Sequence, residues 1–146
     1  MELVDVTTSE ELAEARSLFV EYGASLNFSL CFQSFDEELR TLPGAYTPPR
    51  GRLILARIGG IAAGCIALKP LDSRNCEMKR LYVRPPYRGR RLGQALVHRI
   101  VADARTIGYD AMRLDTIVGS MDQAIALYRT LGFREIATSK IGRAHV

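Results

Sequence analysis

The sequence has no tryptophan and, in 146 residues, only two histidines and three cysteines. Cys31, Cys65 and Cys76 lack C-x-x-C spacing, so neither a disulfide framework nor a metal site is predicted, and we expect them to pack as small apolar side chains. No apolar run approaches the length of a membrane span. Early acidic residues such as Glu2 and Asp5 argue against a signal peptide. These absences favour a cytoplasmic protein.

The bulk composition is that of one soluble globular domain covering residues 1–146. Hydrophobic residues make up 47% and charged residues 25% of the chain, and its formal net charge is +4. A chain of this length can bury a core without disulfides or metal. Acidic residues are interspersed with the basic ones, so the charge does not require a nucleic-acid partner.

Apolar periodicity and turn residues predict the order β, α, α, β, β, β, α, β, α, β. Strands are expected at residues 3–7, 53–58, 61–68, 76–83, 111–118 and 134–137. Helices are expected from Thr8 or Ser9 to about Leu26, from Ser34 or Asp36 to Leu39, and over 92–107 and 121–131. Gly59-Gly60 predicts a hairpin. The fold class is therefore α/β, with a mixed, mostly antiparallel central sheet flanked by helices.

The most informative segment, residues 81–96, reads as a strand, an arginine-rich turn and the start of a helix. The first amides of a helix lack intrahelical partners and carry the positive end of its dipole, which favours bound anions. Guanidinium groups grip phosphate oxygens well, and glycine lets the backbone approach them. Four arginines and two glycines are available here: Arg84, Arg88, Arg90, Arg91, Gly89 and Gly93. The segment predicts a site for a phosphorylated cofactor.

Two motifs together resemble the Gcn5-related N-acetyltransferase (GNAT) family. Residues 88–93 read R-G-R-R-L-G, close to a signature in which glycine stands at the position of Arg91. We expect the Arg91 amide to face phosphate still if its backbone is helical. Residues 124–133, A-I-A-L-Y-R-T-L-G-F, are similar to the family's late helix and its Gly-Phe exit. Met121 stands where many members have asparagine.

The resemblance implies acetyl-CoA as the co-substrate and a GNAT-like fold. In the family the pantetheine arm pairs with the strand before the turn, in a gap opened by a bulge, so backbone groups of Leu81, Tyr82 and Val83 are expected to meet it. The pyrophosphate is then expected to bind at Arg88, Gly89, Arg90, Arg91, Leu92, Gly93 and Gln94.

The resemblance also implies two catalytic residues for direct attack of a primary amine in a ternary complex. Glu77 is the expected base, since an amine must be neutral to attack; the alternative is a strand glutamate paired with Lys79 or Arg80. Strand alternation places Glu77 on the same face as Leu81 and Val83 unless a bulge intervenes. Tyr128 is expected to protonate the departing thiolate; the alternative is a tyrosine packed on a helix surface.

The acceptor is expected to be a small-molecule or peptide amine, with Tyr22, Asn27, Gln33 and Asp36 on the acceptor side. Two other functions stay open. One is a non-catalytic domain that binds or senses acyl-CoA, and the other is an acetyltransferase acting on charged tRNA. Turnover with amines and salt-dependent RNA binding would separate them.

The carboxyl end is short for the family. Only 13 residues follow Phe133, so we expect the last strand to be missing. Residues 141–146 resemble a translated sequencing adapter, which indicates a non-native tail over about 139–146. The sheet edge exposed by a missing strand would favour a homodimer.

Overall fold

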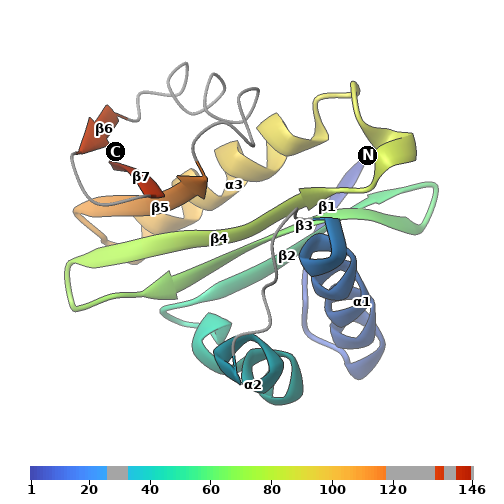
Figure 1. Cartoon of the computed structure of the whole chain (residues 1–146), viewed down its shortest axis with the longest axis horizontal. Helices are drawn as coiled ribbons and strands as arrows, with labels where there is room; N and C mark the ends of the chain where they lie inside the picture. Colours follow the sequence, from blue (N-terminus) through green and yellow to red (C-terminus); the bar gives the residue numbers. More distant parts are fainter. Residues whose placement is uncertain (26–32, 118–133, 137–140, 146) are drawn as a thin grey trace.

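The structure is a computed structural model that describes residues 1–25, 33–117, 134–136 and 141–145. Its described strands form one sheet in the order β1-β2-β3-β4-β5-β7-β6, and β4 and β5 are the parallel pair among otherwise antiparallel neighbours (Figure 1). The strands are β1 Glu2–Asp5, β2 Arg52–Ile58, β3 Ile61–Pro70, β4 Asn75–Val83, β5 Ala111–Ile117, β6 Arg134–Ile136 and β7 Ile141–His145. The predicted fold class is confirmed.

Helices α1 Ser9–Ser25 and α2 Gln33–Thr41 cover one face of the sheet, and α3 Leu92–Ile107 covers the other (Figure 1). A capping box begins α1: the Thr8 hydroxyl accepts the Glu11 amide at 3.1 Å, and the Glu11 carboxylate accepts the Thr8 amide at 3.0 Å. Gly108, with φ 107°, ends α3 in the left-handed conformation common at helix ends. None of the described helices is long and apolar enough to cross a membrane.

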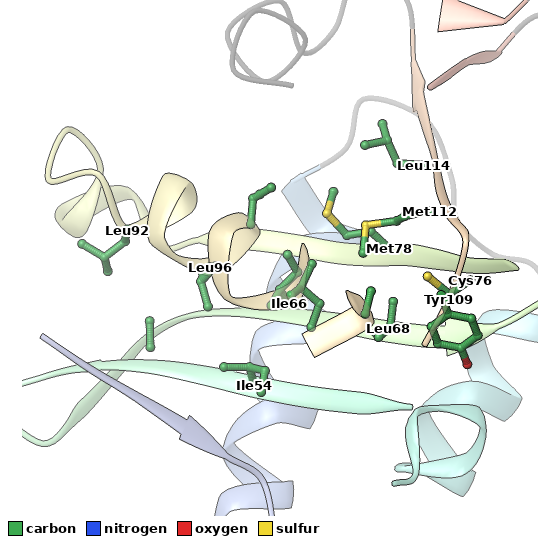
Figure 2. Packing of buried hydrophobic residues seen from close by; sticks show 14 of the residues in the cluster. Ile54, Ile66, Leu68, Cys76, Met78, Leu92, Leu96, Tyr109, Met112 and Leu114 are labelled. Atoms are coloured by element: carbon green, nitrogen blue, oxygen red, sulfur yellow. The ribbon is translucent and has the colours of Figure 1, made fainter. Parts of the chain in front are cut away.

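Each face of the sheet has its own hydrophobic core. Under α3, side chains such as Ile66, Met78 and Leu96 pack together, as Figure 2 shows. On the α1 and α2 side, Phe19 belongs to a second cluster. The prediction that cysteines pack in the core is confirmed for Cys65 and Cys76, which are fully buried, one in each cluster. Cys31 lies outside the described residues.

Burial also sets the chemistry of these thiols. It raises the pKa of Cys76 to about 12 and the pKa of Cys65 further still. Both side chains therefore stay protonated near neutral pH, and neither offers a reactive thiolate.

The structure corrects the expectation that the last strand is missing. Strand β7 lies between β5 and β6, pairing Ile117 with Ile141 on one side and Ile136 with Arg143 on the other. The 13 residues after Phe133 suffice because β6 and β7 have only 3 and 5 residues. Strand β7 consists of the tail residues themselves. The helix expected at 121–131 lies outside the described residues.

Candidate active site

Strands β4 and β5 part halfway along their length. Their parallel pairing ends at Glu77 opposite Arg113, and the rest of β4 has β3 on one side and no described strand on the other. The Arg84 amide donates to Ala63 of β3 at 2.8 Å, so strand alternation turns the peptide groups of Val83 away from β3. The gap between the strands is therefore edged by backbone groups of β4.

A bulge in β4 lies beside this gap. Tyr82 pairs with Cys65 and Lys79 with Ala67, so Arg80 and Leu81 together stand opposite one residue of β3. Arg80 has φ 62°, in the left-handed region that only a few non-glycine residues occupy. The structure thus has an extra residue in β4 next to the open edge.

The bulge changes which side chains share a face. Met78 belongs to the core under α3, and Leu81 and Val83 pack against that same core. Glu77 precedes Met78 and projects to the opposite face, toward α1 and α2. This bulge is the exception that the sequence allowed for: the additional residue reverses the alternation after Lys79, so Glu77 does not share a face with Leu81 and Val83.

The junction between β4 and α3 presents unpaired amides. The first backbone bond of α3 runs from the Ala95 amide to the Arg91 carbonyl at 3.1 Å, and no side chain caps the helix. The amides of Leu92, Gly93 and Gln94 therefore have no intrahelical acceptor. The preceding turn includes Gly89 at φ 84°, with no atom within 4 Å of where a Cβ would stand. This arrangement leaves the backbone accessible to an anion.

Arg91 does not adopt the helical backbone on which the sequence expectation depended. Its φ of 62° and ψ of 23° are left-handed, and it stands at the N-cap of α3. Glycine adopts this conformation without strain, which agrees with glycine as the usual residue at this position of the signature. Arg91 thus keeps the turn that a glycine would form.

Three arginines, rather than the four predicted, stand at this junction with their charge uncompensated. Arg84 is paired with Glu21 at 2.6 Å and also donates to the Ala62 carbonyl at 2.9 Å. Three exposed arginines make no salt bridge with any residue in the described ranges: Arg88, Arg90 and Arg91. Open amides, Gly89 and three guanidiniums fit a diphosphate group.

The arginine side chains also touch their neighbours. The Arg88 Nε donates to the Val83 carbonyl at 2.9 Å, and its guanidinium lies 5.9 Å from the centre of the Tyr82 ring. The Arg90 guanidinium lies 5.6 Å from the centre of the Tyr87 ring. Arg88 thus links the turn to the free edge of β4.

Glu77 lies where β4 and β5 separate. Its side chain is only 12% exposed, and Lys69 Nζ stands 3.7 Å from its carboxylate. The alternative pairing with Lys79 or Arg80 is not found. Instead, Arg80 forms two hydrogen bonds to Glu38 of α2, at 2.8 and 3.0 Å.

The remaining sequence candidates are distributed around this region. Tyr22 of α1 packs edge-to-face on Tyr82, with ring centres 6.2 Å apart. The Tyr82 hydroxyl donates to Glu21 at 3.3 Å, and its carbonyl faces Gly64 of β3. Leu92 is buried in the core under α3. Gln33 and Asp36 fall within α2. Tyr128 and Asn27 lie outside the described residues.

Two cations lie near Glu77: sequence reasoning named Lys79 as a possible partner, and it missed Arg113. Lys79 is half-buried on the same face, and Arg113 stands opposite Glu77 across the β4–β5 pair. No pattern in the sequence points to Arg113, because the pairing that brings it beside Glu77 joins strands far apart in the chain.

Comparisons with known proteins agree with this geometry. An uncharacterized N-acetyltransferase of Schizosaccharomyces pombe is 39% identical over 131 residues, covering 88% of this chain and 80% of that protein. An acetyltransferase structure from Streptococcus agalactiae covers 99% of this chain and 96% of its own, with 21% identity and a TM-score of 0.81. A Salmonella typhimurium structure solved with its cofactor acetyl-CoA covers 100% and 94%, with 16% identity and a TM-score of 0.75.

The two structural neighbours establish the fold alone, because their sequence identities to this chain are too low to show more. The family follows from the sequence itself. The model of the acetyltransferase (GNAT) family matches residues 13–133. The strand-turn-helix geometry agrees with this match. Together with the S. pombe relative, the match shows that the chain belongs to the GNAT family of acetyltransferases.

Proposed function

We propose that this protein transfers an acetyl group from acetyl-CoA to a primary amine by direct attack in a ternary complex. The observation that carries the proposal is the combination of three features in one place: β4 and β5 part at Glu77, β4 bulges at Arg80, and α3 begins without a side-chain cap. Together they offer an extended backbone edge that leads to an anion site.

Acetyl-CoA is the co-substrate that membership of this family implies, and it supplies the activated acetyl thioester. Its diphosphate would be held by the turn and the first amides of α3, with contacts from Arg88, Gly89, Arg90, Arg91, Leu92, Gly93 and Gln94. Its pantetheine arm would lie along the free edge of β4, at Leu81 and Val83, with Tyr82 between them. The three exposed arginines and the uncapped amides support this assignment.

Glu77 is the proposed base. A typical alkyl amine has a pKa of about 10.4, so removal of its proton raises the reactive fraction near neutral pH. The position of Glu77 at the end of the β4–β5 pairing supports this role, since that is where the acetyl group would emerge. Tyr128 is proposed to protonate the departing thiolate. A backbone amide of Leu81 or Val83 would polarise the thioester carbonyl.

Thiol release in the presence of acetyl-CoA and a panel of primary amines tests the proposal. We expect Glu77→Gln to lower kcat/KM by roughly 10²- to 10⁴-fold at neutral pH, the range for general acid–base catalysis, while calorimetry shows unchanged acetyl-CoA affinity. Tyr128→Phe is expected to lower kcat without weakening acetyl-CoA binding. Glu10→Gln, at an exposed position near the start of α1, is the matched control and should change neither quantity.

The alternatives give other results. Acetyl-CoA binding without thiol release, in the parent protein and both variants alike, would identify a sensing domain. Steeply salt-dependent binding of charged tRNA, with acetylation of that substrate alone, would identify the tRNA enzyme. Calorimetry without any association of acetyl-CoA would refute acetyl transfer itself.

A further inference from the structure

Three cations surround Glu77 on its face of the sheet. Cross-strand pairing places Lys69 of β3, Glu77 of β4 and Arg113 of β5 in one row, and Lys79 lies two residues from Glu77 on the same face. Lys69 is engaged by Glu77. The nearby Arg80 is engaged by Glu38. Within residues 1–25, 33–117, 134–136 and 141–145, two further cations, Lys79 and Arg113, form no salt bridge.

Lys79 is a partly buried cation on the same face as Glu77. It stands opposite Ala67, whose side chain belongs to the core beneath α1 and α2. It makes no salt bridge with any residue in the part of the chain that the structure describes. Burial is the main cause that lowers the pKa of this ammonium. A partly desolvated charge of this kind gains from an anionic partner.

Arg113 supplies an independent observation. Its neighbours Met112 and Leu114 are buried in the core under α3, so alternation places Arg113 on the face of Glu77 and Lys79. Its Nε is buried and has no hydrogen-bond partner among the residues that the structure describes. Buried polar atoms are almost always satisfied in folded proteins, and an exception needs an explanation. A bound carboxylate would satisfy this donor.

We infer that the acceptor is a free amino acid or a closely related small molecule, whose carboxylate binds between Lys79 and Arg113 while its amine lies at Glu77. The inference rests on the proposed function and specifies its acceptor. Strands β4 and β5 diverge from the Glu77–Arg113 pair onward, so the two cations flank the opening between them. An amino acid carries a carboxylate next to its amine. The protein offers the complementary charges, the cations Lys79 and Arg113 next to the carboxylate of Glu77.

The same charges assist the chemistry. Two cations near the bound amine disfavour its protonated form, and Glu77 can take the proton that the amine loses. A cavity of about 270 Å³ opens beside Lys69, the salt-bridge partner of Glu77, and is lined also by Glu38 and Tyr46. The N-terminus or a lysine of a folded protein has no free carboxylate next to its amine, so such acceptors are disfavoured.

The experiment compares each free amino acid with its methyl ester and its decarboxylated amine, using thiol release from acetyl-CoA. The amine of the methyl ester has a lower pKa than the amine of the free amino acid. If the protein does not recognise the carboxylate, the ester should therefore react faster than the free amino acid, so a preference for the acid indicates recognition. We expect at least one free amino acid to have a kcat/KM roughly 10- to 100-fold above both counterparts, the range for a hydrogen bond to a charged group.

Substitutions identify the carboxylate-binding residues. Lys79→Met keeps the length of the side chain without its charge and should reduce the preference for the acid to near unity, mainly through KM. Lys79→Arg should restore most of it. Arg113→Gln should act like Lys79→Met if the protein stays folded, which acetyl-CoA calorimetry checks. Arg105→Gln removes an exposed charge from the far end of α3 and should leave the preference unchanged.

The two proposals fail in different ways. Acetylation of amines with equal rates for acid, ester and decarboxylated amine overturns the inference and leaves acetyl transfer standing. The inference is overturned in the same way if Lys79→Met retains the full preference for the acid. If acetyl-CoA does not associate with the protein at all, the proposed function is refuted and the acceptor assignment falls with it.

Discussion

At the residue scale, Arg91 holds a left-handed backbone at the N-cap of α3, with φ 62°. This conformation costs a residue with a Cβ about 1–2 kcal/mol, whereas glycine adopts it without a steric penalty. The guanidinium adds a positive charge beside the first amides of the helix. Arg91 therefore lowers the stability of the fold through its backbone conformation and favours anion binding through its charge. Substitution of Arg91 can separate the two effects.

We expect Arg91→Gly to leave the free energy of unfolding unchanged or to raise it by up to about 1 kcal/mol, because relief of strain offsets the entropy of glycine. The affinity for acetyl-CoA should fall, since one guanidinium is lost. Urea unfolding and calorimetry measure the two effects. Arg90→Gly is the matched control: the Arg90 φ is not positive, so this change should destabilise the protein while also weakening binding. Equal destabilisation by both changes would contradict this explanation.

At the scale of elements, β3 and β4 approach each other closely next to the bulge. A Cβ built on Gly64 would stand 2.7 Å from the Tyr82 carbonyl oxygen and 3.4 Å from Leu96 Cδ1. The first contact is with backbone and cannot be relieved by a rotamer change. Gly64 therefore lets β3 lie against the part of β4 that is open on its other edge.

Gly64→Ala is expected to lower the free energy of unfolding by about 1–3 kcal/mol through overpacking, and to weaken acetyl-CoA binding by displacing Tyr82. Thermal unfolding and calorimetry would show both. The control for stability alone is Gly93→Ala in α3, where the nearest atom to a new Cβ is 3.9 Å away and φ is not positive; because Gly93 belongs to the proposed diphosphate site, acetyl-CoA binding is not compared in this variant. There we expect a gain of about 0.5–1 kcal/mol, as for other compatible glycine positions in helices.

The same elements show how far sequence reasoning reaches. The bounds of α3 and the hairpin of β2 and β3 follow from local signals: an apolar period, Gly108 as a helix end, and Gly59-Gly60 as a turn. The bulge at Arg80 was expected only through the family resemblance, and the reversal of faces that it causes depends on the register between β3 and β4, which no local preference encodes.

The site was predictable to a similar degree. An arginine-rich turn before a helix is a local feature, so the residues of the proposed diphosphate site could be named from the sequence. The pairing of Arg84 with Glu21 joins residues 63 positions apart, and that of Arg80 with Glu38 joins residues 42 apart. Such long-range pairs decide which arginines keep a free charge, and they exist only once the chain is folded.

At the scale of the whole molecule, α1 is tied to the open end of β4 by Glu21, which accepts hydrogen bonds from Arg84 and from the Tyr82 hydroxyl. The hydrogen bond from Arg84 is the main cause that lowers the pKa of Glu21 below its usual 4.5. A carboxylate whose folded-state pKa is lowered stabilises the fold above its unfolded pKa. This contribution is lost as the pH falls through the lowered value.

We therefore expect the difference in unfolding free energy between the parent protein and Glu21→Gln to be constant from about pH 5 to 8 and to shrink below about pH 4.5. The Glu21 side chain is 37% exposed, so water screens the pair and the difference should be about 1 kcal/mol or less. Urea unfolding across this pH range measures it. A difference that stays constant down to about pH 3 would contradict the assignment.

The open edge of β4 lies inside the sheet, with β5 across the gap, and not at its outer border. An outer border with unsatisfied amides invites another polypeptide to add a strand, which is the usual route to aggregation. An interior slit admits only a slender, extended molecule that can thread between two strands. If the proposed function holds, the protein would thereby offer the backbone groups of this edge to a small amide-bearing ligand while denying them to its neighbours in a crowded solution.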